Sequence, residues 1–166
     1  MLTQEQLKRV LAYNPETGVF VWTVDRTASA KKGAVAGTTA KRWRGIDYVV
    51  LSVFGKKYYA HQLAVLYMTG NFPAKTVDHI DGNGLNNCWT NIREAEVCEN
   101  AWNAKTSVRN TSGRKNVSWY KRLKKWRVTV SKNGKTVDKY FADFDLAELV
   151  AEEARVLLHG NFAKHA

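Results

Sequence analysis

The sequence has few of the residues that covalently or conformationally restrain small folds, namely cysteine and proline. It also has no segment that would cross a membrane. It contains two cysteines and two prolines in 166 residues, so a disulfide framework is excluded, and Cys88 and Cys98 lack the paired C-x-x-C spacing of a structural zinc site. No window approaches the ~20 uninterrupted apolar residues of a spanning helix, and residues 1–13 lack the apolar core of a secretory signal. We therefore expect a cytoplasmic protein whose fold depends on packing.

Acidic residues are also scarce relative to basic ones. The chain has 26 Lys and Arg against 15 Asp and Glu, a net charge of +11. Residues 106–141 hold 11 basic residues and a single acid, Asp138, interspersed with the aromatic residues Trp119, Tyr120, Trp126 and Tyr140. Basic and aromatic side chains together indicate a nucleic-acid partner. A merely solvated basic surface is the alternative.

The N-terminal half reads as a mixture of short helices and strands. Thr3 and Gln6 form the pattern of a capping box, which predicts a helix over residues 3–12. Further periodicity predicts strands over residues 19–22, 46–54 and 56–60, a loop or irregular strand over 26–43, and a largely buried helix over 60–69 closed by Gly70.

Beyond Pro73 the pattern becomes strand, long loop, strand and helix. A short strand at residues 75–77 leads into Asp78 and His79, and a loop rich in Asp, Asn and Gly follows. A return strand is predicted at 91–94 and a helix at 95–103.

The last segment predicts a small sheet covered on one face. Alternating residues give strands at 117–120, 126–131 and 137–141, and Asn133-Gly134 is a strong hairpin turn. The closing helix, at 145–158, should bury a stripe made of Leu146, Leu149, Val150, Ala154, Leu157 and Leu158. The uncovered face of this sheet should carry Ser118, Tyr120, Arg127, Thr129 and Tyr140. The whole chain is thus expected to be α+β.

Asp78 and His79 form the strongest candidate for chemistry. Neighbours on a strand point to opposite sides, so both can address one atom only if the strand ends there, which the Asp-Gly-Asn-Gly loop favours. A neutral imidazole can take a proton from water, and a carboxylate with amide oxygens can hold a hard divalent cation. Such a pair suits phosphodiester hydrolysis.

Other interpretations of this loop stay open to different degrees. Residues of these types often form nothing more than a turn. A calcium loop fails on spacing, because the twelfth position counted from Asp81 is Ile92 rather than Glu. A zinc cluster of His61, His79, Cys88 and Cys98 fits no defensible motif.

Residues 78–100 resemble the HNH endonuclease motif with its ββα-metal fold. The resemblance is carried by Asp78 to Asn83, Asn86-Asn87, Asn91 to Ala95 and Asn100, and its intervals are similar to those of phage homing endonucleases. It implies His79 as the general base, Asn91 as the residue that braces the loop and orients His79, and Asp78 and Asn100 as ligands of one divalent ion. Oxygen ligands favour Mg²⁺, and Mn²⁺ fits the same set.

The C-terminal segment resembles a second family, the ethylene-response-factor type of DNA-binding domain. The resemblance lies in residues 112–119, 125–128, 140–141 and 159–163, with Asn116 and Asp138-Lys139 departing from the family pattern. That family lays a three-stranded sheet in the major groove with a helix behind it. The implied DNA contacts are Arg114, Ser118, Tyr120, Arg127 and Thr129 toward bases, and Lys115, Lys121, Arg122 and Lys124 toward phosphates.

Together these patterns predict a metal-dependent HNH endonuclease of homing type that nicks or cleaves double-stranded DNA in a phage-infected or prokaryotic cell. The expected organisation is a nuclease domain at 1–105 with its ββα core at 74–103, a linker at 106–115 and a DNA-binding domain at 116–166. No membrane and no obligate protein partner are expected. A catalytically inactive, sequence-specific DNA-binding regulator is the alternative, and a nuclease acting on RNA is a third reading.

Overall fold

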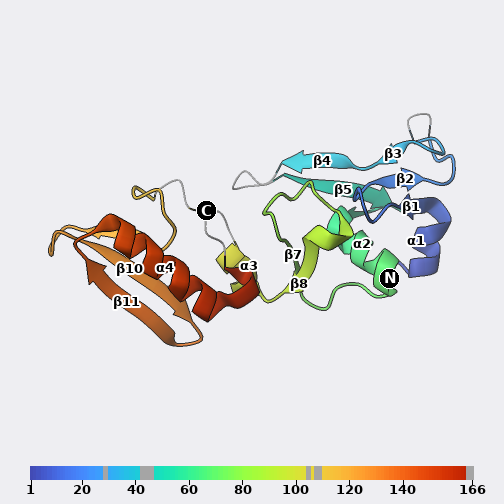
Figure 1. The fold of residues 1–166 in the computed structure, drawn as a ribbon. Helices are drawn as coiled ribbons and strands as arrows, with labels where there is room; N and C mark the ends of the chain where they lie inside the picture. The colour runs from blue at the N-terminus through green and yellow to red at the C-terminus, as the bar shows by residue number, and fades with distance from the viewer. Residues whose placement is uncertain (28–29, 42–46, 104–105, 107–109, 164–166) are drawn as a thin grey trace. The chain divides into compact units, whose positions relative to one another are not determined.

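The computed structural model describes residues 1–27, 30–41, 47–103, 106 and 110–163, except the side chains of residues 100, 101, 103 and 161. The chain divides into two compact units, Met1–Val97 and Cys98–Ala166 (Figure 1). This division groups residues 98–103 with the second unit, ahead of residue 105, where the sequence predicts the end of the nuclease domain. No helix in the described ranges is long and apolar enough to span a bilayer.

The first unit begins with a short capped helix and a three-stranded sheet. The capping box of Thr3 and Gln6 is present and starts α1 (Gln4–Val10). The predicted helix was two residues too long at its end, because Leu11 leaves the helix to pair with Trp22 in an antiparallel ladder. The sheet order is β1-β2-β3, with bounds Leu11–Tyr13, Phe20–Trp22 and Val35–Ala36.

A second sheet and a buried helix complete the core of this unit. The strands β4 (Thr38–Lys41), β5 (Asp47–Val53) and β6 (Lys56–Tyr59) are antiparallel in that order. Helix α2 (Ala60–Thr69) ends at Gly70, as the sequence predicts, and its inward residues reach nearly zero exposure. The core joins α1, α2 and both sheets around Leu7, Leu11, Phe20, Leu51, Leu63 and Leu66.

The predicted strand, loop, strand and helix are present. The strands β7 (Thr76–His79) and β8 (Ile92–Ala95) pair antiparallel, with Asp78 opposite Arg93. A 3-10 turn, Trp89–Asn91, leads into β8, and α3 (Val97–Asn103) follows it in the chain. His79 is the last residue of β7, so the strand ends two residues later than the predicted strand at 75–77.

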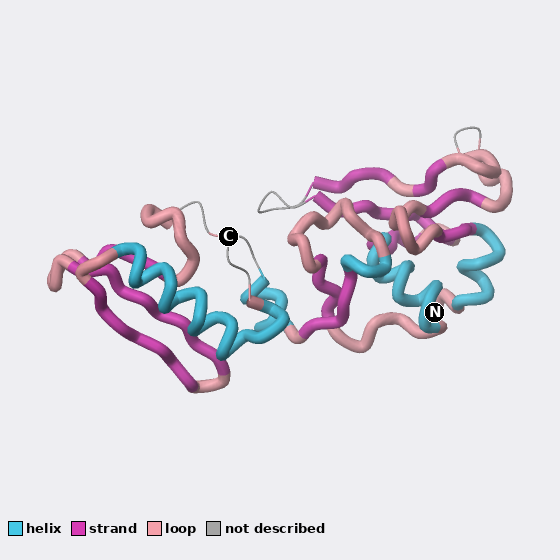
Figure 2. Tube along the Cα trace, in the orientation of Figure 1, coloured by secondary structure: helices cyan, strands magenta, loops and turns pink. Residues whose placement is uncertain are grey.

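Beyond the residues of α3, the second unit contains a three-stranded antiparallel sheet with a helix along it (Figure 2). The strands β9 (Val117–Tyr120), β10 (Lys125–Lys132) and β11 (Lys135–Phe141) lie in the order β11-β10-β9. Helix α4 (Phe144–His159) is capped by the Asp143 side chain and is followed by the turn Gly160–Phe162. The predicted α+β class is confirmed, including a small sheet that packs on one helix.

The predicted apolar stripe of α4 is wrong in three of its six members, whereas Ala154, Val150 and Leu158 do pack on the sheet. The residues that are buried against the sheet are Ala147, Ala151 and Ala154, whereas Leu146, Leu149 and Leu157 are 47%, 53% and 81% exposed. Alanine allows the helix axis to approach the sheet closely, so the face that packs best is the one with the smallest side chains. Hydrophobicity alone therefore misplaced the buried face.

Truncation of the α2 core should destabilise the protein. Leu63 has no exposed surface, so Leu63→Ala leaves a cavity and is expected to lower the free energy of unfolding by about 2–5 kcal/mol. Met68 lies on the same helix with 42% of its surface exposed, and Met68→Ala serves as the control with a much smaller loss. Urea unfolding measures both, and equal losses would contradict the placement of the helix.

Candidate active site

Asp78 and His79 lie side by side at the end of β7 and are both nearly inaccessible. Asp78 is 4% exposed and His79 is 5% exposed. The Oδ2 atom of Asp78 accepts hydrogen bonds from Nε and Nη2 of Arg93, at 3.0 and 2.9 Å. This ion pair follows from the register of the two strands, which sets Asp78 opposite Arg93. The sequence analysis gave Arg93 no role, although the strand pairing it predicted could have found this contact.

The ring of His79 is held by Asn87. The Nε2 atom of His79 lies 3.3 Å from Oδ1 of Asn87, and the amide of Asn87 is oriented because its Nδ2 donates to the carbonyl of Leu85 at 3.1 Å. With an amide oxygen facing Nε2, that nitrogen carries the proton and the lone pair of the neutral ring resides on Nδ1. Asn87 is thus a positioning residue that the motif contained but to which the sequence analysis assigned no role.

The environment of His79 favours the neutral base. Burial lowers the pKa of His79 below 6.5, and this effect outweighs the hydrogen bond with Asn87 and the nearby charges of Asp81 and Asp78, which act in the opposite direction. A neutral imidazole is the form that can accept a proton.

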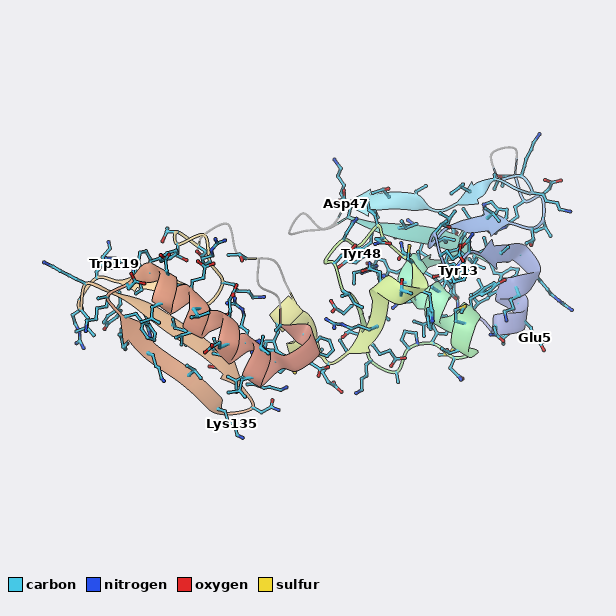
Figure 3. All side chains as sticks on the ribbon, in the orientation of Figure 1. Glu5, Tyr13, Asp47, Tyr48, Trp119 and Lys135 are labelled. Carbon is cyan, nitrogen blue, oxygen red and sulfur yellow. The ribbon has the colours of Figure 1, made fainter. Side chains whose placement is uncertain are left out.

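Two aromatic rings, those of His61 and Tyr48, pack against the ring of His79, and a third lies behind His61. His61, in the first turn of α2, contacts His79 edge to face with ring centroids 5.1 Å apart, and Tyr59 stacks on His61. Tyr48 of β5, which is labelled in Figure 3, packs against both imidazoles. Its ring centroid lies 5.7 Å from that of His61 and 5.9 Å from that of His79. The structure gives His61 a packing role directly against His79.

Asp81 is the centre of the loop that follows. Its carboxylate accepts the backbone N–H of Asn83 and the side-chain amides of Asn86 and Asn91, at 2.8, 2.8 and 3.0 Å. Burial raises the pKa of Asp81, but these three hydrogen bonds together lower it more, so the pKa lies below 3.8. The charged carboxylate therefore holds the loop closed.

Asn91 connects the two ends of this loop. Its Oδ1 accepts the backbone N–H of Asp81 at 3.1 Å, and its Nδ2 donates to the carbonyl of Asn86 as well as to Asp81. Its backbone carbonyl accepts the N–H of Ile80 at 2.8 Å. Asn91 thereby braces the segment on both sides of Asn87.

The N-terminal sheet supports the loop from outside. The hydroxyl of Tyr13 donates to the carbonyl of Asn87 at 2.7 Å, and the N–H of Trp89 donates to the carbonyl of Pro15. Gly18 has a φ of +72°, and a Cβ there would lie 2.3 Å from the carbonyl carbon of Asn87. The β1–β2 turn therefore packs so tightly on the loop that only glycine fits at residue 18.

The predicted metal ligands are described unequally by the structure. Asp78 is buried at the end of β7, whereas the side chain of Asn100, on α3, lies outside the described residues. Within the described ranges no group of three or more His, Cys, Asp and Glu side chains could hold an ion. A site with one carboxylate and neutral oxygens is nevertheless the donor set that a hydrated hard cation accepts, so the chemistry of Asp78 fits Mg²⁺ better than zinc.

The predicted DNA contacts occupy different environments in the second unit. Ser118, Tyr120, Arg127 and Thr129 alternate with the buried residues of β9 and β10 and so lie on the face away from α4. Lys121, Arg122 and Lys124 follow in the β9–β10 turn, whose residues are exposed. Arg114 pairs with Glu148 of α4, and Nζ of Lys115 donates to the carbonyl of Trp102. The last two side chains are therefore engaged within the unit.

Comparison with known proteins agrees with this geometry. Residues 58–102 match the model of the HNH endonuclease family, and this segment includes β7, the Asp81 loop, β8 and nearly all of α3. Protein 3.8 of Escherichia phage T7 is 48% identical over 90 residues, which cover 53% of this chain and 73% of that protein. The chain belongs to the family of this phage protein and contains an HNH endonuclease domain. No solved structure matches the chain.

The carboxylate of Asp81 should make the first unit acid-sensitive. Its pKa in the folded protein is below the ordinary 3.8, so the stabilisation is complete above pH 3.8 and is lost as the pH falls through the lower folded value. Asp81→Asn is expected to lower the free energy of unfolding at pH 7 by about 1 kcal/mol and to flatten its dependence on pH below 4.

Glu16→Gln is the matched control, because Glu16 is exposed in the β1–β2 turn. Unfolding by urea at a series of pH values measures the effect. Identical curves for Asp81→Asn and the unaltered protein between pH 3 and pH 7 would show that the loop does not depend on this charge.

Proposed function

We propose that the protein is a divalent-metal-dependent endonuclease that hydrolyses a phosphodiester bond of double-stranded DNA. The observation that carries this proposal is the pairing of a buried, oriented His79 with the neighbouring carboxylate of Asp78 at the end of one strand. The HNH match over residues 58–102 supports the same chemistry.

His79 is the proposed general base. With Nε2 directed at Asn87, the proton from an attacking water would be accepted at Nδ1. The packing of His61 and Tyr48 restricts rotation of the ring, so that the lone pair keeps one direction as the substrate binds. Asn91 acts through the loop and is a positioning residue.

Asp78 and Asn100 are the proposed ligands of the ion, Mg²⁺ or Mn²⁺. When bound, a divalent ion supplies charge stabilisation at the phosphate and at the leaving oxygen. Arg93 fixes the direction of the Asp78 carboxylate through two hydrogen bonds to one oxygen. Its positive charge also favours the approach of a phosphate group.

The second unit is proposed to hold the DNA. Its open sheet face and its β9–β10 turn carry most of the predicted contacts, in the region that has 11 basic residues and one acid. For this unit we propose the sheet-in-groove binding that the resemblance to ethylene-response-factor domains implies. Asn116 adopts a φ of +66°, a conformation that glycine adopts freely and asparagine tolerates, so this departure from the family pattern is compatible with the turn.

We retain as proposals a nuclease domain at 1–105, a linker at 106–115 and a DNA-binding domain at 116–166, with homing-type nicking or cleavage as the activity. A non-catalytic DNA-binding regulator is the second candidate. The ion pair between Asp78 and Arg93 favours it, because the carboxylate already has a cationic partner. Both candidates require DNA binding that weakens steeply with salt, so only cleavage separates them.

Loss of the base or of the carboxylate should abolish cleavage. His79→Ala is expected to lower the rate of plasmid nicking in Mg²⁺ by about 10²–10⁴-fold, the usual contribution of a general base, and Asp78→Asn should also lose activity. Conversion of supercoiled to nicked or linear plasmid, followed on agarose gels, measures the rates.

Glu16→Gln should cut like the unaltered protein, since Glu16 is exposed and takes no part in the site. Binding of the same plasmid by His79→Ala, measured without metal, should be unchanged. If the unaltered protein and the three variants nick equally, or if nicking persists in EDTA, the non-catalytic DNA-binding regulator becomes the better-supported function. Preferential cutting of RNA in competition would change the substrate while keeping the site.

Asn87 should matter for the reaction as a positioning residue. Asn87→Ala removes the acceptor for Nε2 of His79, and we expect a fall in nicking rate of about tenfold or more with DNA affinity retained. Asn87→Asp, which keeps an oxygen at the same position, should recover part of the rate. If Asn87→Ala cuts normally, the tautomer and orientation of His79 do not depend on this contact.

A further inference from the structure

The open face of the second unit carries an arginine that is already fixed by an acid. Arg127 of β10 donates from Nε to Oδ1 of Asp138 at 2.8 Å and from Nη2 to Oδ2 at 2.7 Å. The two residues lie on neighbouring strands, since Thr129 is the direct partner of Asp138 and Tyr140 that of Arg127. The contact is a side-on fork between two half-exposed side chains.

This fork leaves one edge of the guanidinium directed away from the acid. Arginine has five N–H donors, and Asp138 uses one on Nε and one on Nη2. Two donors on Nη1 and one on Nη2 are left, and one from each nitrogen forms the end-on pair of parallel N–H groups. Such a pair matches two acceptors on one edge of a planar partner.

Two tyrosines flank the same guanidinium. Its central carbon lies 6.0 Å from the ring of Tyr120 and 5.8 Å from the ring of Tyr140, and the two rings are 5.3 Å apart. Cation–π contacts from two neighbouring strands add to the fork in limiting the rotation of Arg127. The side chain is therefore held by three residues on an exposed surface.

The position of the acid is informative because its charge opposes DNA binding. Asp138 is the one acid among residues 106–141, and it lies on the face where phosphates would approach. A carboxylate there weakens the attraction for any polyanion, and it also neutralises Arg127 as a simple phosphate contact. A fixed arginine with a free end-on edge is suited to reading a base rather than to adding charge.

We infer that Asp138 is a positioning residue that presents Arg127 to a guanine in the major groove. Guanine offers the O6 and N7 acceptors that the end-on pair of an arginine recognises, and no other base presents two acceptors on that edge. This inference rests on the proposed function, because it assumes that the open sheet face is the one that binds DNA.

The test is a selection from duplexes with a randomised central segment. The full-length protein is used in EDTA, so that bound DNA is not cut, and the enriched sequences are compared with those selected by Arg127→Ala, Asp138→Asn and Glu153→Gln. The unaltered protein should enrich a site with an invariant guanine. At that position, the preference for guanine over the other bases should fall by about tenfold or more in Arg127→Ala. In Asp138→Asn a substantial part of the same preference should be lost.

Charge alone predicts a different outcome. Asp138→Asn and Glu153→Gln each remove one negative charge, but Glu153 is exposed on α4, on the other side of the sheet. Affinity for an unrelated duplex should rise in Asp138→Asn although its guanine preference falls, whereas Glu153→Gln should keep that preference. Circular dichroism verifies that each variant is folded, and Arg127→Lys, which keeps the charge but not the fork, should fail at the same guanine.

The possible failures are distinguishable. Enrichment of a site in which no guanine responds to Arg127→Ala would overturn the inference while leaving the sheet as the DNA-binding face. An unchanged guanine preference in a folded Asp138→Asn variant would overturn the role of the acid. Binding without any enrichment, with all variants alike, would overturn both the inference and the proposed reading face.

Discussion

The closure of the loop by Asp81 and Asn91 is the constraint on which the first unit's site depends. The carboxylate of Asp81 accepts hydrogen bonds from three N–H groups, and the backbone N–H of Asp81 donates to Oδ1 of Asn91. Asn87 lies between these contacts and holds His79 by one hydrogen bond at its ring. Since a single 3.3 Å contact is weak by itself, its direction is reliable only if the backbone around Asn87 cannot move. Tyr13 and Gly18 provide that restriction from the N-terminal sheet.

Much of this arrangement could be predicted from local sequence, and what could not be has a common cause. The strand that leads into Asp78 and His79, the hairpin turn at Asn133-Gly134 and the bounds of α2 follow from periodicity and turn residues, which act over a few positions. The contacts of Arg93, Asn87 and His61 join residues 8 to 18 positions apart, and they depend on strand register and on the path of a loop. The pattern contained these residues but could not assign them partners.

The second unit shows where hydrophobic pattern fails even for a regular helix. Leucine at 146, 149 and 157 predicts the buried face of α4, but the helix buries alanine at 147, 151 and 154. These alanines form one buried cluster with Val128 and Val130 of the sheet, where small side chains allow the backbones to approach and pack closely. Shape complementarity depends on both the helix and the sheet, so it cannot be predicted from the sequence of the helix alone.

In both units a carboxylate fixes the orientation of neighbouring polar side chains. In each case a carboxylate that performs no chemistry accepts several N–H groups and so fixes side chains that packing alone would leave mobile: Asp81 fixes Asn86 and Asn91, and Asp138 fixes Arg127. An ionised carboxylate suits this role because two oxygens offer about four acceptor positions in one plane. Near the surface such a carboxylate also costs little to desolvate. In the interior, an acid would require a full set of hydrogen-bond partners. Both acids work against the binding of a polyanion, so their presence is explained by the direction they impose on neighbouring donors rather than by the charge they carry.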